Sequence, residues 1–421
     1  MVKLWPNCWV NPVTALAVTE DLANAIMARR QKLNQQSSMN GDNYRHRLVL
    51  GLILSLIAFL LYVNTLNHRF VLDDGPAITE NHTVKQGVKG IPDLLKTDYR
   101  AGAFIAKGTL YRPLSLVMFA IEWQFFPDNP LPGHLINVFL YALTGYLLFT
   151  LLNRLMPGTS LLIAFSITLL FIVHPIHTEV IANIKSRDEI LSFLFVLAAL
   201  HLSVRNTNIG TLIVAGTCYF FSLMSKESSI TIVAVVPVLL YFFTDMPRKK
   251  IFVTTAVFVF AASAYLILRR VVLGEISGIS DVPPIDNFLV LANDFNSKTA
   301  TAMEILGKYL QLMFFPHPLS IDYAYNQIPI VNWANYKPLL SVSAYLGMIV
   351  LALFRIQKKE LWVFGIIFYL ITMSLYTNLF ITIGSGFGER FLYVPCLGFC
   401  IAIVALLAKL WKFSGQPQKL Q

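Results

Sequence analysis

The sequence predicts an all-α, polytopic membrane protein. Hydrophobic residues make up 56% of the 421-residue chain and charged residues only 13%, and the mean hydropathy is +0.62. Soluble globular domains carry about twice that share of charged residues. Ten apolar stretches could each cross about 30 Å of hydrocarbon as a helix. We therefore expect a transmembrane helical bundle with about ten spans, in a range of about nine to twelve.

The expected spans are separated by short polar connections and by two longer segments. They comprise residues 48–65, 133–152, 160–174, 189–204, 209–224, 228–243, 251–268, 336–354, 361–380 and 391–411. Two further apolar stretches, 110–126 and 302–316, carry charged residues and fit interfacial helices better than spans. Counting the first of them as a span would put the basic segment 248–250 on the outer side.

Basic residues in short loops set the orientation of the bundle, because cytoplasmic loops collect Lys and Arg. With ten spans and both termini inside, the basic short loops fall in the cytoplasm. Most acidic residues then lie outside, in long loops at about 66–132 and 270–335 and in short loops between them. We therefore expect the chemistry on the outer face.

The two ends of the chain differ from the membrane domain expected at 48–411. Residues 1–47 are interpreted as a cytoplasmic extension without a cleavable signal, and Met39 is an alternative start residue. Residues 412–421 form a short basic tail on the cytoplasmic side.

The net charge of +10 would suggest a nucleic-acid partner in a soluble chain. Here the basic residues lie mostly in short loops between apolar stretches, so we expect no nucleic-acid binding. The four cysteines show neither a metal-type pairing with histidines nor an extracellular framework, which argues against a disulfide or zinc role.

Two adjacent carboxylates, Asp73 and Asp74, follow the first apolar stretch within ten residues. Charges near a bilayer are costly unless they face water, so such a pair predicts a functional site. The simpler interpretation is that the two aspartates cap a solvated loop. Either residue could serve as a catalytic base, with a pKa raised by its neighbour and by partial burial. The pair also fits a divalent cation such as magnesium or manganese, so the metal requirement stays open.

Several cations are expected at outer helix ends, against the orientation preference. They are Arg112, Lys185, Arg187, Lys226, Arg269, Arg270 and Arg390. A lipid phosphate held by charge-assisted hydrogen bonds would explain them, and so would ordinary ion pairs with neighbouring acids. For the phosphate of a donor we select Arg112, Arg187, Lys226 and Arg390.

The densest polar cluster lies at 174–189, where one span ends and the next begins. His174 and His177 have a spacing that resembles metal ligands, but Pro175 breaks the helix between them, so a hydrogen-bonded rim is favoured. Further polar residues stand at outer helix ends, where His134 could equally be a helix-end residue. The candidates for orienting a substrate are His134, Asn137, His174, His177, Glu179, Glu227 and Glu389.

Eight short motifs occur in an order that resembles a known enzyme family. They are Phe70-Val-Leu-Asp-Asp74, Ile78-Thr-Glu-Asn81, Tyr111-Arg-Pro-Leu114, Pro132-Gly-His-Leu-Ile-Asn137, His174-Pro-Ile-His-Thr-Glu179, Lys226-Glu227, Pro318-Leu-Ser-Ile-Asp-Tyr323 and Glu389-Arg-Phe-Leu-Tyr-Val-Pro395. Together they resemble the transmembrane O-mannosyltransferases with tetratricopeptide repeats, which are GT-C glycosyltransferases. The resemblance covers about 48–411, and the sequence stops at Gln421 without the repeats.

The resemblance implies a GT-C bundle that transfers a sugar, with inversion, from a polyprenyl-phosphate donor to a hydroxyl acceptor. It also implies an acid of the first outer loop, Asp73 or Asp74, as the base. Mannose is one candidate sugar, and the acceptor is a protein, a lipid-linked glycan or a cell-envelope polymer. A lipid-linked sugar flippase and an inactive binding homologue are the alternatives. The absence of repeats favours a bacterial inner membrane with a periplasmic site over the endoplasmic reticulum with a lumenal one.

Overall fold

The computed structural model describes residues 45–103, 109–157, 159–205, 208–274, 282–284, 286–320, 322–323, 327–379 and 382–411. The chain divides into two units, Met1–Leu50 and Gly51–Gln421. Only 45–50 of the first unit are described, and they are helical. The expected N-terminal extension up to residue 44 and the expected tail at 412–421 lie outside the described residues. The account that follows concerns the second unit.

The described part of the chain is helical throughout, with turns and loops but no β-strand, which confirms the all-α prediction. Each of the ten expected spans corresponds to a helix. In chain order the long helices are the first helix Arg45–Asn67, α5 (Pro130–Leu155), α6 (Leu161–Val173), α8 (Arg187–Arg205), α9 (Ile209–Ser225), α10 (Ile232–Phe243), α11 (Arg248–Leu273), α13 (Tyr336–Arg355), α14 (Leu361–Met373) and α15 (Pro395–Leu410).

Length and composition qualify four described helices as membrane spans, namely the first helix, α5, α11 and α13. A fifth span arises if α6 is taken together with the helical segment Pro175–Ala182, to which it is joined by a bend of 50°. The bend occurs at Pro175, where the sequence predicts a break. Ten spans thus remain a prediction. Four further apolar helical segments are shorter than a full span, and α8 begins with three charged residues.

Local sequence signals explain where several helices begin and end. The side chain of Asn129 accepts a hydrogen bond from the backbone N–H of Leu131, so α5 begins at Pro130, before the predicted boundary. The C-terminal cap of α11 is Gly274, whose φ of 82° a glycine adopts without strain. Helix α14 is shorter than the predicted span 361–380, because Asn378 adopts a φ of 53° and its amide oxygen accepts a hydrogen bond from the N–H of Ile383.

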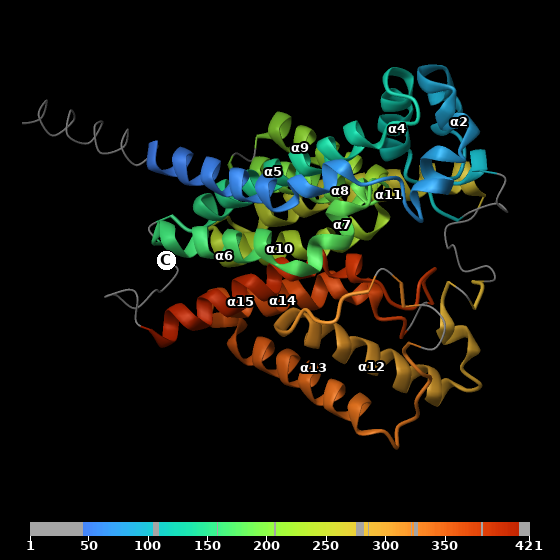
Figure 1. Cartoon of the computed structure of the whole chain (residues 1–421). Helices are drawn as coiled ribbons and strands as arrows, with labels where there is room; N and C mark the ends of the chain where they lie inside the picture. Colours follow the sequence, from blue (N-terminus) through green and yellow to red (C-terminus); the bar gives the residue numbers. More distant parts are fainter. Residues whose placement is uncertain are drawn as a thin grey trace, which may run out of the picture. The chain divides into compact units, whose positions relative to one another are not determined.

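Neighbouring helices form antiparallel pairs, of which α8 with α9 and α14 with α15 have the most extensive contacts (Figure 1). The hairpin of α12 (Phe295–Phe314) and α13 packs beside α14. Small residues bring α14 and α15 together. A Cβ atom on Gly398 would lie 2.6 Å from the Gly365 carbonyl oxygen and 2.6 Å from the Tyr369 nitrogen, so only glycine fits there.

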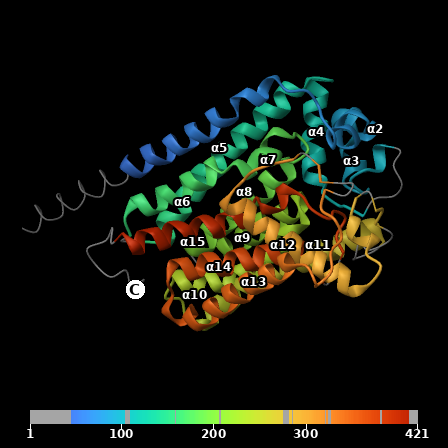
Figure 2. The ribbon, with the colours of Figure 1, turned by 60° about the horizontal axis from the view of Figure 1, so that its bottom comes forward.

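The segment between the first helix and α5, which we expect to be the first outer loop, forms a small helical subdomain at one end of the bundle (Figure 2). It contains α2 (His82–Lys85), α3 (Ile91–Leu94) and α4 (Pro113–Phe125), and α4 corresponds to the expected interfacial helix 110–126. Its core includes Ile78, Leu94, Tyr99 and Phe119, and Ile184 from the segment before α8 packs into the same core. This packing fixes the loop that carries the two aspartates against the start of α8.

The close approach of α14 and α15 should make Gly398→Ala destabilising. The added methyl group would overlap backbone atoms of α14, which cannot move aside as a side chain could, so we expect a loss of about 1 to 3 kcal/mol in the free energy of unfolding. Thermal unfolding in detergent measures it. Gly347→Ala on α13 is the matched control, because no atom lies within 4 Å of the added Cβ. Equal melting temperatures for the two variants would contradict the packing argument.

Candidate functional site

The Asp74 side chain joins two distant segments of the chain. One carboxylate oxygen accepts the backbone N–H of Val71 at 2.9 Å, and the other accepts the backbone N–H of Lys185 at 2.8 Å. Asp74 is completely buried. It therefore fastens the first outer loop to the segment before α8, and neither of its oxygens faces the solvent.

Asp73, in contrast, is open to solvent, since 37% of its side chain is exposed. Its Oδ2 lies 3.6 Å from the Lys185 Nζ. Lys185, and after it Arg390 and Arg100, hold the pKa of Asp73 below its ordinary value, although partial burial opposes them. Burial raises the pKa of Asp74 to about 6, against the two backbone hydrogen bonds. The raised pKa expected for one member of the pair thus falls on Asp74, while Asp73 is the ionised and accessible acid.

Alternating charges continue inward from Asp73. The Lys185 Nζ lies 3.8 Å from the Asp188 Oδ2, which accepts a hydrogen bond of 2.7 Å from Arg112. Arg112 also forms two hydrogen bonds, of 2.8 and 2.5 Å, with Glu227. Buried charges are tolerated only when paired in this way. The polar groups of Arg112 and Glu227 therefore bind each other, and the pair stabilises the protein beneath the site.

Two other predicted phosphate ligands are also buried and paired. Arg187 is fully buried, and it donates to both carboxylate oxygens of Glu122, to Asn137 Oδ1 and to the Gly133 carbonyl. This network ties α4 and α5 to α8. Lys226 is paired with Glu189 on α8. Arg187 and Lys226 thus serve helix packing in this structure, as do Asn137 and Glu122.

Arg390 is the predicted phosphate ligand whose charge lowers the pKa of Asp73. Its Nη1 donates to Glu179 Oε1 at 2.5 Å, and its backbone N–H donates to the other Glu179 oxygen at 2.8 Å. About a quarter of its side chain, 24%, is exposed. The charges of Asp73 and Glu179 both raise the pKa of Arg390 against the effect of burial. The site therefore combines two partly exposed side chains, Asp73 and Arg390, with Lys185 and Glu179, whose side chains are only 8% and 11% exposed.

The remaining predicted residues contact other parts of the chain rather than Asp73 in the structure. His134 and His177 are fully buried, and the ring of His177 packs against Tyr393 at 5.0 Å and Phe171 at 4.5 Å. His174 Nε2 lies 3.1 Å from the Met313 carbonyl oxygen. Glu389 accepts hydrogen bonds from the Tyr323 hydroxyl at 2.6 Å and the Ser320 N–H at 2.7 Å, and thereby holds the second outer loop. A hydrogen-bonded rim that orients a substrate stays a prediction.

Lys185 was absent from our sequence-based selection of phosphate ligands. Its only signal was its position among the cations expected on the outer side. The position of Lys185 next to Asp73 becomes visible only in the fold. The hydrogen bond from the Lys185 backbone N–H to Asp74 places the Lys185 ammonium group beside Asp73.

The aspartate pair has few free oxygens for a divalent cation. Both Asp74 oxygens accept backbone N–H groups, and Asp73 faces an ammonium group. Among the described residues, no three His, Cys, Asp or Glu side chains are grouped as a metal site. Magnesium and manganese prefer several oxygen ligands. The aspartate pair therefore offers fewer oxygen ligands to a cation than we expected from the sequence alone.

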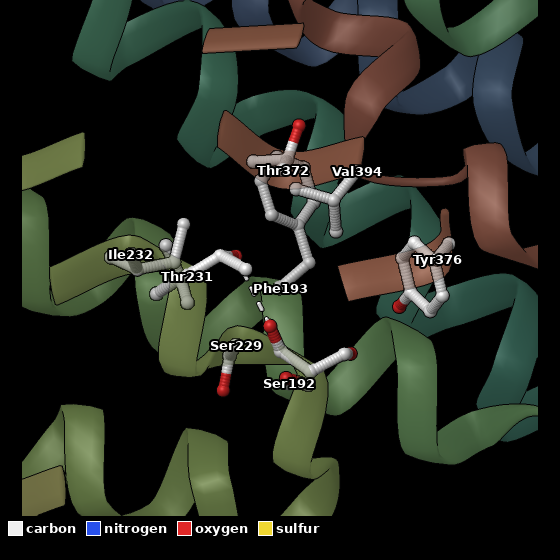
Figure 3. A pocket seen from close by; sticks show the side chains of 10 residues that line it. Ser192, Phe193, Ser229, Thr231, Ile232, Thr372, Tyr376 and Val394 are labelled. Atoms are coloured by element: carbon white, nitrogen blue, oxygen red, sulfur yellow. Dashed lines mark hydrogen bonds between the residues drawn. The ribbon is translucent and has the colours of Figure 1, made fainter. Parts of the chain in front are cut away.

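A small polar cavity lies deeper in the bundle (Figure 3). Hydroxyl groups of Ser192, Ser229 and Thr372 line it together with Phe193 and Tyr376, which come from α8, α14 and the helical turns Glu227–Thr231 and Ser374–Tyr376. Its volume of about 10 Å³ is close to that of a single water molecule. It is therefore too small for a sugar or a lipid headgroup, and it contains none of the predicted site residues.

The apolar helices identify the chain as a multi-pass helical membrane protein. Its charged site contains a half-exposed acid, Asp73, under the influence of two cations. Proteins with similar sequences are named as enzymes. The chain is 26% identical over 366 residues to protein O-mannosyl-transferase F38B6.6 of Caenorhabditis elegans, covering 85% of this chain and 51% of that protein. It is 25% identical over 449 residues to human protein O-mannosyl-transferase TMTC2, covering 85% of this chain and 52% of that protein.

These similarities confirm the resemblance read from the sequence motifs. Tmtc1 of Drosophila melanogaster is 34% identical over 193 residues, which are 44% of this chain and 22% of that protein. The chain spans about half the length of the worm and human relatives. No protein-family profile and no solved structure matches the chain. These relatives are animal proteins, so the expected bacterial location has no support from them.

The different environments of the two aspartates predict different effects on stability. Asp74→Asn replaces one acceptor oxygen by an amide group that cannot accept an N–H, so it should lower the free energy of unfolding by about 1 to 3 kcal/mol. Asp73→Asn removes only a half-exposed ion pair and should cost less than about 1 kcal/mol. Thermal unfolding in detergent at neutral pH compares them. The reverse order of stabilities would show that Asp73 is the structural residue.

The stability contribution of Asp74 should also depend on pH. Because its pKa is raised from 3.8 to about 6 in the folded protein, protonation of Asp74 stabilises the fold. This proton-linked part of its contribution is complete below the ordinary value and is lost as the pH rises through about 6, which leaves the contribution of the hydrogen bonds. The stability gap between the wild type and Asp74→Asn should therefore narrow between about pH 4 and about pH 7. Denaturation curves across this range measure the gap. A gap that stays constant or widens would contradict the effect of burial on Asp74.

Proposed function

We propose that the chain is an integral-membrane glycosyltransferase that moves a sugar from a polyprenyl-phosphate donor to a hydroxyl acceptor on the outer side of the membrane. The observation that carries the proposal is the half-exposed carboxylate of Asp73, which lies 3.6 Å from the Lys185 ammonium group and whose pKa is also lowered by the charge of Arg390. A site of this kind offers a base to the acceptor and positive charge to a departing phosphate within one small volume.

The proposed reaction is a single displacement at the anomeric carbon. The acceptor oxygen forms a bond to this carbon, its proton passes to Asp73, and the bond between the carbon and the phosphate oxygen breaks. The configuration is inverted because the acceptor and the leaving group occupy opposite faces. Lys185 and Arg390 stabilise the negative charge that develops on the phosphate. Asp74 does not react but holds the backbone of Lys185.

Donor binding would also adjust the strength of the base. In the free protein the charges of Lys185 and Arg390 hold the pKa of Asp73 low, which makes it a weak proton acceptor. A phosphate bound between these cations would offset their charge and raise the pKa of Asp73. Asp73 would therefore become an effective base only when the donor is present.

Mannose, a protein acceptor and a GT-C architecture are the finer parts of the proposal. The names of the worm and human relatives support mannose as the sugar and protein as the acceptor. The worm and human relatives are animal proteins, so of the two locations expected from the sequence we propose the endoplasmic reticulum, with the site in the lumen.

The first test is turnover by the purified protein in detergent with radiolabelled polyprenyl-phosphate sugars. The wild type should consume the donor and release lipid phosphate. Asp73→Asn should reduce this turnover by about 10² to 10⁴-fold while donor binding persists, because only the base is removed. Asp93→Asn, an exposed acid in the same outer loop, should leave the rate unchanged.

Other results of this experiment would refute the proposal. A flippase would move the lipid-linked sugar across a vesicle membrane without consuming it, and an inactive homologue would bind the donor without turnover. Full activity of Asp73→Asn would exclude this residue as the base. If Asp73→Asn lost donor binding together with turnover, a metal-binding or structural role would be favoured.

A further inference from the structure

Leu72, which directly precedes the proposed base, adopts a backbone conformation that is costly for leucine. Its φ is +43°, and among the described residues the other non-glycine positions with positive φ are Asp128, Lys359 and Asn378, all polar. For residues with a Cβ this left-handed region costs about 1 to 2 kcal/mol, and glycine or asparagine adopts it more easily. A leucine at this position is thus unfavourable for the backbone alone.

Packing of the Leu72 side chain does not offset this strain, since 61% of the residue is exposed. Val71 beside it is 40% exposed. Leu72 therefore lies at the tip of the turn without the burial that normally makes a leucine side chain stabilising. Unusual backbone geometry of this kind concentrates at functional sites, where a side chain has to be presented to a ligand.

The surrounding hydrogen bonds hold this turn rigidly. The Asp74 N–H donates to the Val71 carbonyl at 2.9 Å, and the Gly75 N–H donates to the Leu72 carbonyl at 3.0 Å. The carboxylate of Asp74 binds the N–H groups of Val71 and Lys185. The apolar tip is thus fixed relative to the ammonium group that faces Asp73.

An apolar surface next to paired cations matches one class of ligand. In a polyprenyl phosphate the charged group is joined directly to an isoprenoid chain, so its binding site needs positive charge and an apolar contact side by side. Lys185 and Arg390 provide the charge near Asp73. Leu60, Leu61 and Val63, near the end of the first helix, are also exposed.

We propose that Leu72, together with Val71, contacts the isoprenoid chain next to the donor phosphate and so selects lipid-linked donors over water-soluble sugar phosphates. The inference rests on the donor class proposed above and assigns a specificity residue to it. It places the lipid chain on the same side of Asp73 as the first helix. A polypeptide acceptor and the bulk bilayer are the competing occupants of this surface.

The test compares binding of two phosphates that differ only in the apolar part. Isothermal titration with a short-chain, water-soluble isoprenyl phosphate and with methyl phosphate requires no turnover. In Leu72→Asn we expect about tenfold weaker binding of the isoprenyl phosphate, because an apolar contact is lost, and unchanged binding of methyl phosphate. Leu72→Met should retain the preference of the wild type for the isoprenyl phosphate.

Two controls separate this effect from misfolding. Leu72→Asn should melt at the same temperature as the wild type or higher, because asparagine relieves the backbone strain. Leu95→Asn changes an exposed leucine elsewhere in the same outer loop and should leave both affinities unchanged. A comparable loss in Leu95→Asn would overturn the assignment of the contact to Leu72.

Each other outcome refutes a defined part of the proposal. If Leu72→Asn binds both phosphates as the wild type does, Leu72 faces the bilayer and the inference is wrong while the proposed function stands. If only the KM for the acceptor rises in turnover assays, the surface binds the acceptor instead. If the wild type itself binds neither phosphate, the donor class and with it the proposed function fail.

Discussion

The hydrogen bond from the Lys185 backbone to the buried carboxylate of Asp74 is the contact on which the site depends. It joins two segments that are far apart in the chain, and it does so with a side chain that is withdrawn from solvent. A buried carboxylate without such partners would be strongly destabilising. The same contact sets the distance between Lys185 and Asp73, so the structural role of one aspartate creates the electrostatic environment of the other.

Charge pairing explains why most cations near this site are unavailable to a ligand. Arg112, Arg187 and Lys226 lie in apolar surroundings, where an unpaired charge would cost several kcal/mol, and each has a carboxylate partner. Lys185 is buried as well, but its ammonium group lies more than 3.5 Å from both of its partners, Asp73 and Asp188. The Arg390 side chain is 24% exposed, so Arg390 is the most accessible of the predicted phosphate ligands.

The outer-loop subdomain gives the charged site its rigidity. Its core is small, but Ile184 anchors it beside the segment that carries Lys185, and Glu122 anchors α4 to Arg187. The aspartate turn is thus held from both sides. A rigid turn can keep a strained and exposed leucine in place, which a mobile loop would relax.

The sequence by itself determined the membrane class, the ten helical segments, the break at Pro175 and the acidic pair after the first apolar stretch. These features follow from local properties, namely apolar runs and proline geometry. Only the tertiary structure decided that Asp73 is partly exposed and Asp74 buried, that Arg187 pairs with Glu122, and that Lys185 rather than Lys226 faces Asp73. Such pairings join segments distant in the chain, so helix packing selects them and no local pattern encodes them.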